Sequence, residues 1–329
     1  MSEARQAAHD AAALAARTAY GRLVAYLAAR WRDVAAAEDA LGDALVAALE
    51  TWPRDGVPDK PEAWLFTAAR RRLLDAARRA GVRAEAAADL RIVMDDTHGA
   101  GDASFPDERL KLLFVCAHPA IDETVRTPLM LQTVLGLDAA RIAAAFVVAP
   151  ATMGQRLVRA KAKIRDAGIR FEVPERRELP PRLEAVLEAI YAAYGTAWED
   201  VDGADPRRRG LADEAIWLGR LVTRLLPGEP EALGLLALML HCEARRAARR
   251  DADGRYVALA EQDVARWSRA AIEEAEQLLA RAAEAGAPGR FQLEAAIQSV
   301  HAQRATSGRH TDWDAIALLY EGLIRIAPT

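Results

Sequence analysis

The sequence predicts an all-α protein. Apolar residues recur at helical spacing along almost the whole chain, and almost no stretch alternates apolar and polar residues with the period of two that a half-buried strand shows. Hydrophobic residues make up 52% of the 329, enough for a packed core, while aromatic residues contribute only 6%. This length exceeds one ordinary domain, so we expect two or three helical domains.

Three helices are predicted before residue 80. Residues 11–50 show helical spacing in two stretches, of which the second runs from about 34 to 49. Residues 52–61 are predicted to be a loop, because three prolines and one glycine oppose a continuous helix there. A strong helix is predicted over 62–79. The glycines and acids of residues 81–106 then predict a flexible linker.

A second compact unit is predicted over about 107–170. One helix ends near His118-Pro119 and another covers about 123–135. Two more helices follow within 137–165, joined by the tight turn Val-Val-Ala. Asp138 is placed to cap the first of them, and Pro150 starts the second at a position that proline favours.

The helix that begins at Pro150 has two distinct faces. At 100° per residue, one face is apolar and carries Met153, Leu157, Ala160 and Ile164. The opposite face carries Thr152, Gln155, Arg156, Arg159 and Lys163. This division is typical of a helix-turn-helix, in which one face docks on the preceding helix and the other presents hydrogen-bond donors to the major groove.

The C-terminal part, from about residue 182, predicts pairs of helices. Its first helix carries an apolar stripe, and the junction Leu-Pro-Gly-Glu-Pro-Glu-Ala-Leu at 226–233 is loosely repeated at 287–293. These features resemble divergent tetratricopeptide-like repeats. Such repeats stack into a solenoid whose concave face commonly binds a partner.

The charges are unevenly distributed. The formal net charge of −4 would ordinarily argue against a nucleic-acid binder. However, residues 64–83 carry six Arg and one acid, and residues 150–170 carry six Lys or Arg and one acid. Residues 178–329 carry 18 Arg and 24 acids. Two basic stripes within an acidic chain indicate contact with nucleic acid.

Several other classes of protein are disfavoured. The two cysteines, Cys116 and Cys242, lie far apart in the sequence, which suits a reducing cytoplasm. The polar N-terminus and the lack of a run of about 18 apolar residues predict a soluble, cytoplasmic protein.

Without a phosphate loop, a nucleophile elbow or a His pair at metal spacing, we expect no enzyme. His98, Cys116 and His118 show no evident fourth zinc ligand, so neither a metal nor a cofactor is expected.

The N-terminal part contains a distinctive set of residues, namely Asp33, Ala37-Glu38-Asp39, Trp52, Trp64-Leu65, Ala69-Arg70, Asp75 and Arg78-Arg79. This set resembles region 2 of the extracytoplasmic-function (ECF) sigma factors of bacterial RNA polymerase. The recognition helix of region 4 in the same family is similar to Ala151-Thr152-Met153, Gln155-Arg156-Leu157 and Arg159-Ala160-Lys161.

One subgroup of these sigma factors, which carries a tetratricopeptide-like extension, is especially similar. The similar segments are 114–120, 156–161, 163–168, 233–240 and 311–313 leading to 319–320. The resemblance implies four parts, namely region 2 in 1–83, an acidic flexible linker in 84–106, region 4 in 107–177 and the extension in 178–329. The sequence ends at Pro328-Thr329, where relatives continue with further helices, so we expect a truncated or shortened extension.

The resemblance also implies the partners, core RNA polymerase and promoter DNA. The acidic helix that starts at Asp33 would hold the clamp-helix coiled coil of the β′ subunit, and region 4 would touch the β flap. The acids expected at the polymerase contact are Asp33, Glu38, Asp39 and Asp43. Gly42 stands where the family usually has Gln, so this contact is expected to be slightly altered.

Two groups of residues are expected to contact the promoter. The loop 53–61 and the helix 62–79 would melt the −10 element and hold it as a single strand, which requires basic and aromatic surface. The expected −10 contacts are Lys60, Trp64, Arg70, Arg71, Arg72, Arg78 and Arg79, although Trp64 is also expected to serve the core. The expected −35 contacts are Thr152, Gln155, Arg156, Arg159 and Lys163. Arg71 replaces the usual Asn, so the family's −10 preference is not transferred.

Two other interpretations stay open. A stand-alone helix-turn-helix regulator with a helical-repeat interaction domain would explain residues 137–165 but would leave 30–83 without a purpose. A scaffold in which only the repeats matter is disfavoured by the basic stripes. In the sigma factor interpretation the extension replaces a separate anti-sigma factor. We expect the extension to dock on region 2 or region 4, or to bind another protein. Whether it activates or inhibits the sigma factor is left open.

Overall fold

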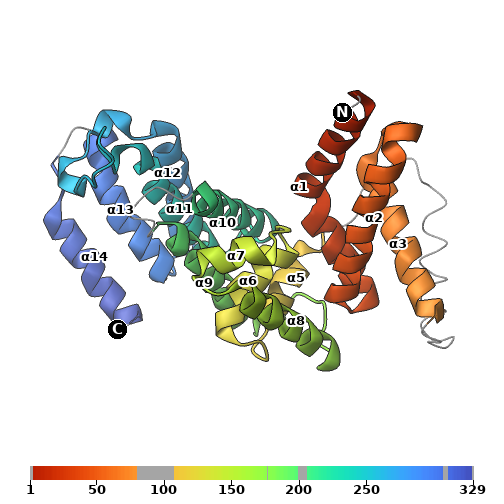
Figure 1. Cartoon of the computed structure of the whole chain (residues 1–329). Helices are drawn as coiled ribbons and strands as arrows, with labels where there is room; N and C mark the ends of the chain where they lie inside the picture. Colours follow the sequence, from red (N-terminus) through yellow and green to blue (C-terminus); the bar gives the residue numbers. More distant parts are fainter. Residues whose placement is uncertain (1–2, 80–106, 176, 199–205, 307–309, 328–329) are drawn as a thin grey trace. The chain divides into compact units, whose positions relative to one another are not determined.

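The computed structural model describes residues 3–79, 107–175, 177–198, 206–306 and 310–327, and these ranges consist of helices joined by turns and loops (Figure 1). Within them, the only β pairing is an isolated bridge between Arg250 and Tyr256. The chain divides into two compact units, Met1–Val186 (unit 1) and Leu187–Thr329 (unit 2). The all-α prediction is confirmed for the described residues. The predicted linker 84–106 lies outside them.

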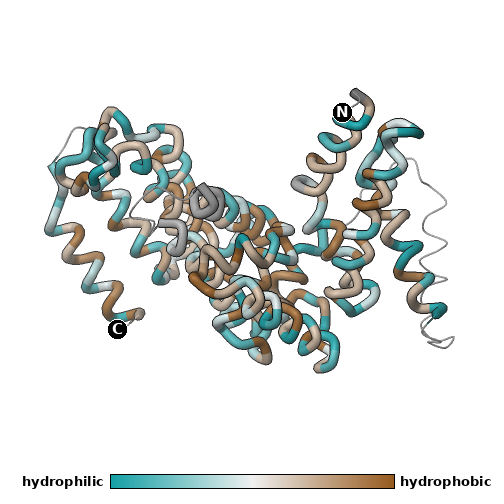
Figure 2. The backbone as a smooth tube through the Cα atoms, viewed as in Figure 1, coloured by the Kyte–Doolittle hydropathy of each residue, from teal (hydrophilic) through white to brown (hydrophobic). Residues whose placement is uncertain are grey.

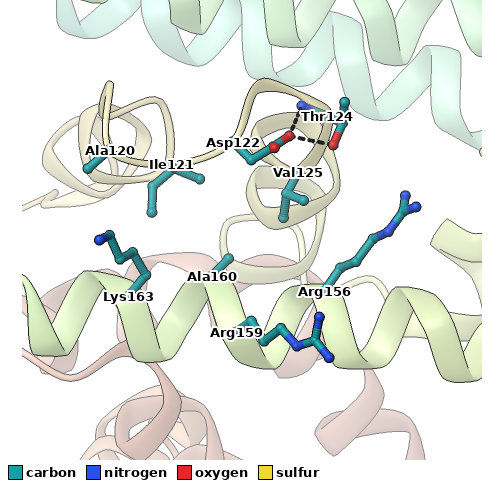
Figure 3. A pocket seen from close by; sticks show the side chains of 9 residues that line it. All are labelled: Ala120, Ile121, Asp122, Thr124, Val125, Arg156, Arg159, Ala160 and Lys163. Atoms are coloured by element: carbon teal, nitrogen blue, oxygen red, sulfur yellow. Dashed lines mark hydrogen bonds between the residues drawn. The ribbon is translucent and has the colours of Figure 1, made fainter.

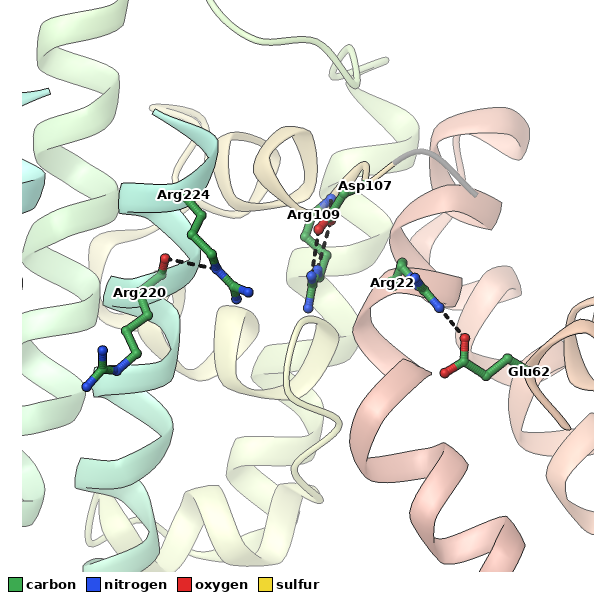
Figure 4. Close-up of polar contacts among 6 residues, drawn as sticks. All are labelled: Arg22, Glu62, Asp107, Arg109, Arg220 and Arg224. Atoms are coloured by element: carbon green, nitrogen blue, oxygen red, sulfur yellow. Dashed lines mark hydrogen bonds and ion pairs between the residues drawn. The ribbon is translucent and has the colours of Figure 1, made fainter. Parts of the chain in front are cut away.

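Unit 1 begins with three helices that pack on one another, α1 (Glu3–Trp31), α2 (Val34–Asp55) and α3 (Pro61–Arg79). Their shared core is formed by Leu23, Leu27, Leu41, Leu65, Phe66 and Leu73, all at most 5% exposed. Tyr26 of α1 meets the Phe66 ring edge-to-face at 5.5 Å. An ion pair between Arg22 and Glu62 joins α1 to α3 at the surface (Figure 4).

The predicted end of α2 is wrong. The sequence predicts a loop over 52–61, but residues 52–55 are helical and α2 continues through Trp52 and Pro53 to Asp55. A proline in the last turn removes one helical hydrogen bond without stopping the turn that precedes it. The helix ends at Gly56, whose φ of 87° suits glycine and whose N–H donates to the Trp52 carbonyl at 3.0 Å. The first helix also begins earlier than predicted, at Glu3.

The second half of unit 1 contains α5 (Arg109–Cys116), α6 (Glu123–Thr133), α7 (Ala139–Ala145) and α8 (Pro150–Asp166). Helix α5 carries Arg109 and Lys111 near its start, and its other residues are apolar. Those from Leu112 to Cys116 are fully buried, so this part of α5 lies in the interior of the unit. Here α5 contacts α6 and also α1.

The predicted caps and turn around α7 and α8 are present. The Asp138 carboxylate accepts a hydrogen bond from the Arg141 N–H at 2.8 Å, which caps α7. The tight turn contains Val147 with a φ of 53°, an uncommon conformation for a β-branched residue. Pro150 then occupies the first turn of α8. Helices α7 and α8 pack on each other, with the turn between them.

Helix α9 (Leu179–Trp198) spans the division between the units. Unit 2 continues with α10 (Pro206–Leu225), α11 (Pro230–Ala244), α12 (Arg269–Ala283), α13 (Arg290–Thr306) and α14 (Trp313–Ile326), with three short 3-10 turns between α11 and α12. Helix α11 is the centre of the unit, because it packs against α10, α12 and α13. Its residues from Ala232 to His241 are all buried, and Figure 2 shows the strongly apolar character of this region.

The two similar junctions noted in the sequence meet in space. Glu231, in the first turn of α11, accepts hydrogen bonds from the Phe291 N–H at 2.9 Å and the Gln292 N–H at 3.1 Å. Its carboxylate therefore caps the N-terminus of α13, which carries positive partial charge. Gly289 allows this approach, because a Cβ there would lie 2.2 Å from the Glu231 carboxyl carbon.

Candidate functional site

The two faces predicted for α8 are confirmed. Met153, Leu157, Ala160 and Ile164 are buried, each at most 7% exposed. The five residues of the predicted −35 contact are all exposed, namely Thr152, Gln155, Arg156, Arg159 and Lys163. The apolar face thus holds the helix on its neighbours while the polar face remains available to a ligand.

A cavity of about 400 Å³ lies between α8 and the start of α6. Arg156 and Lys163 rise from α8 toward the segment 120–125, with Ala160 between them, and Arg159 lines the same cavity (Figure 3). The opposite wall contains Asp122, whose pKa is lowered by hydrogen bonds from the Thr124 side chain and backbone. The three cations make this surface suitable for a phosphate group.

The predicted polymerase-binding acids of α2 lie in different environments. Asp33 caps α2 by accepting a hydrogen bond from the Ala36 N–H at 3.0 Å. Asp39 is exposed. Asp43 is exposed and pairs with Arg72 of α3 at 3.0 Å, so one predicted polymerase contact touches one predicted −10 contact.

Glu38 is the least accessible of these acids. Its carboxylate lies 2.6 Å from the Lys161 ammonium of α8, and the two side chains are only 9% and 11% exposed. Burial raises the pKa of Glu38 even though Lys161 opposes that rise. The helix α8 therefore reaches back to α2 through a cation that was not among the predicted site residues.

The predicted −10 residues follow α3 and the loop before it. Trp64 is half-buried and meets the buried Trp52 edge-to-face at 5.5 Å, which supports the expected core role. Arg70 is half-buried, and its Nε has no hydrogen-bond partner among the described residues. The exposed members are Lys60, Arg71, Arg72, Arg78 and Arg79, of which Arg78 lies 3.5 Å from Asp75.

Sequence reasoning missed Lys161 and Arg165. Both lie on an edge of α8 between its apolar and polar faces, and Arg165 comes within 3.8 Å of Asp33. Their partners are more than 100 residues away in sequence, so helical periodicity alone does not reveal the pairing. Two cations on one edge, next to an apolar stripe, are the only sequence signal of this contact.

The residues considered for zinc have other contacts. The Cys116 thiol is buried 3.4 Å from the Thr133 hydroxyl, and burial raises its pKa to about 12. The His118 Nδ1 accepts a hydrogen bond from the Ala120 N–H at 3.1 Å. His98 lies outside the described residues. Within the described ranges no cluster of His, Cys, Asp or Glu could hold a metal ion, and no helix is long and apolar enough to cross a membrane.

Comparisons with known proteins match two segments of the chain to families. Residues 17–83 match sigma-70 region 2, and residues 182–283 match a family of unknown function, DUF6596. An uncharacterised protein of Rhizobium meliloti (strain 1021) is 40% identical over 327 residues, which are 97% of this chain and 76% of that protein. The chain belongs to the family of this Rhizobium protein. No solved structure matches this chain.

Within this family, the chain combines an N-terminal sigma-70 region 2 domain with a C-terminal DUF6596 domain. Region 2 indicates a sigma factor role in transcription initiation, with core RNA polymerase as the partner, and proteins of this class are not enzymes. The two domain matches leave residues 1–16, 84–181 and 284–329 outside them. The assignment of α5 to α8 as region 4, the ECF subgroup and the tetratricopeptide-like character of unit 2 therefore stay predictions.

Proposed function

We propose that the protein is a sigma factor of the ECF type, in which α2 binds core polymerase, α3 holds the −10 strand and α8 reads the −35 duplex. The observation that carries this proposal is the division of α8, whose apolar face is buried while all five predicted DNA contacts are exposed. The region 2 domain on the same chain contains α3, so the proposal has one helix for the −10 element and one, α8, for the −35 element.

Helix α3 supports the −10 part of the proposal. Arg71, Arg78 and Arg79 are exposed on it, and Trp64 lies half-buried near its start. A groove that holds a single strand needs cations for the phosphates and aromatic surface for the bases. Arg72 would have to leave its surface ion pair with Asp43 to contribute, which costs little because both side chains are at least half exposed.

Unit 2 is the proposed regulatory extension. It is built on the buried helix α11, and its DUF6596 match covers most of it. The exposed apolar residues of α14, among them Trp313 at 67% and Leu318 at 69%, are consistent with a partner-binding role for this unit.

The test is run-off transcription with core RNA polymerase on fragmented genomic DNA, followed by mapping of the RNA 5′ ends. A sigma factor yields transcripts that start at defined sites and share two upstream elements, and Asp39→Lys should reduce them by weakening core binding. A stand-alone regulator would instead shift duplex DNA without polymerase and yield no such transcripts. That second result would reject the proposed function.

A further inference from the structure

Helices α2 and α8 are joined by an ion pair that is withdrawn from water. The Glu38 and Lys161 side chains lie 2.6 Å apart and are about nine-tenths buried. Burying a charge is costly unless a partner compensates it, so this pair specifies one arrangement of the two helices. Removing Lys161 would leave Glu38 buried without its cation.

A glycine contact lies next to this pair. Gly21 of α1 is buried against the C-terminal end of α6, and a Cβ at this position would lie 1.8 Å from the Val134 carbonyl oxygen. Gly136, which follows α6, faces the ring of Tyr20, the residue before Gly21 on α1. A Cβ at Gly136 would lie 2.8 Å from the nearest carbon of this ring. Real Cβ atoms do not approach other atoms so closely, so the Val134 carbonyl and the Tyr20 ring come this near only because both positions are glycine.

These contacts cover part of the surface proposed for core polymerase. Glu38 is paired with Lys161, and Asp33 lies 3.8 Å from Arg165, so two of the four predicted acids face α8. Lys161 is in turn directed toward α2, while Arg165 lies 2.9 Å from Asp166 of its own helix and 3.8 Å from Asp33, and neither cation lines the cavity of Arg156, Arg159 and Lys163. Acids of α2 and cations of α8 therefore neutralise one another within unit 1.

We propose that this contact, formed by Gly21, Val134, Gly136, Glu38 and Lys161 and called the clasp below, is a closed state of the free protein that must open before α2 binds core polymerase. The proposal rests on the proposed function, because it assumes that the acids of α2 are the polymerase contact. A protein whose competent state is only fractionally populated binds its partner more weakly by that fraction. Opening the clasp should therefore speed association with core.

The test uses two variants of the full chain. Gly21→Ala inserts a methyl group into the clasp, and Lys161→Met removes the cation while keeping its length. Neither residue belongs to the proposed polymerase or DNA contacts. Gly195→Ala in α9 is the matched control, because it also places a methyl group on a helix but meets nothing within 4 Å. Circular dichroism checks that each variant is folded.

Two measurements are made on each variant. Hydrogen exchange at residues 134–137 and around Tyr20 reports opening of the clasp without any polymerase. The association rate with core polymerase reports its consequence. We expect both variants to exchange faster at these residues and to bind core about fivefold to tenfold faster than the native chain, as a larger competent fraction predicts. Gly195→Ala should match the native chain in both.

The outcomes separate the two proposals. Unchanged exchange and unchanged association rates in folded Gly21→Ala and Lys161→Met would reject the clasp as a closed state. Faster exchange without faster association would reject its control over core binding. If the native chain and all variants fail to bind core, the proposed function fails, while the exchange data still decide whether the clasp opens.

Discussion

Arg156 and Lys163 lie on the same exposed face of α8 but are expected to contact different parts of the promoter. Arg156→Ala should cost about 1–3 kcal/mol in holoenzyme binding and change the base preference at one −35 position, as expected for a lost base contact. Lys163→Ala should weaken all sequences alike and reduce the salt dependence, as expected for a lost phosphate contact. Val158→Ala is the control, since Val158 is 64% exposed and carries no donor. Equal, sequence-independent losses from both would make Arg156 a backbone contact.

His241 is a buried titratable residue at the centre of unit 2. Burial lowers its pKa from 6.5 to about 4, and the positive charge of Arg245 adds to this. His241 therefore takes up a proton near pH 6.5 in the unfolded chain, but only near pH 4 in the folded protein. The stability that comes from neutral His241 is therefore present above about pH 6.5 and is lost as the pH falls toward 4.

We expect His241→Gln to remove this part of the acid sensitivity, up to about 3 kcal/mol in the free energy of unfolding between pH 7 and pH 4. Denaturant unfolding at several pH values measures the difference. The control is His9→Gln, because the His9 side chain is 65% exposed. Parallel pH profiles for native protein and His241→Gln would contradict the prediction.

At the scale of elements, the cap that Glu231 places on α13 should be a main determinant of unit 2 stability. Glu231→Ala leaves the Phe291 and Gln292 N–H groups without their acceptor, which should cost about 1–3 kcal/mol in unfolding free energy. Glu229→Ala is the matched control, since that side chain caps no N–H of α11. Similar unfolding midpoints for the two variants would show that the cap contributes little.

Elements whose boundaries depend on local chemistry were largely predictable. Asp138 and Pro150 marked the starts of α7 and α8 correctly, and the four apolar residues of α8 are buried as their spacing indicates. Pro53 predicts a loop by residue type alone, but it lies in the last turn of α2, where a proline does not end the helix before it. Pairings such as Glu38 with Lys161 depend on packing between distant segments, which periodicity does not report.

At the scale of the whole molecule, the extension should not be separable from unit 1 at residue 177. Arg182 of α9 donates a hydrogen bond to the Phe114 carbonyl at 2.7 Å, and Leu183 and Val186, which belong to the same unit, are buried. Loss of these two side chains should destabilise the chain 1–177 by about 2–4 kcal/mol relative to 1–186. Thermal unfolding of both truncated chains measures this, and equal stability would place the boundary at 177 after all.

The chain 1–186 also tests regulation by the extension. We expect it to bind core polymerase but to initiate transcription at its promoters to a different extent from the full chain, with the same set of start sites. Run-off transcription with matched amounts of the two proteins provides the comparison. Indistinguishable output would mean that unit 2 serves another purpose than control of initiation.

The three sides of α8 have a consequence for how this helix tolerates mutation. One side fills the interior, a second carries the promoter residues and the edge with Lys161 and Arg165 meets α2. Few of its residues are then neutral, and Val158 is the clearest of them. In a saturation library, substitutions on the three sides should segregate into those that lower protein abundance, those that change which genes are expressed and those that raise expression from all target promoters together.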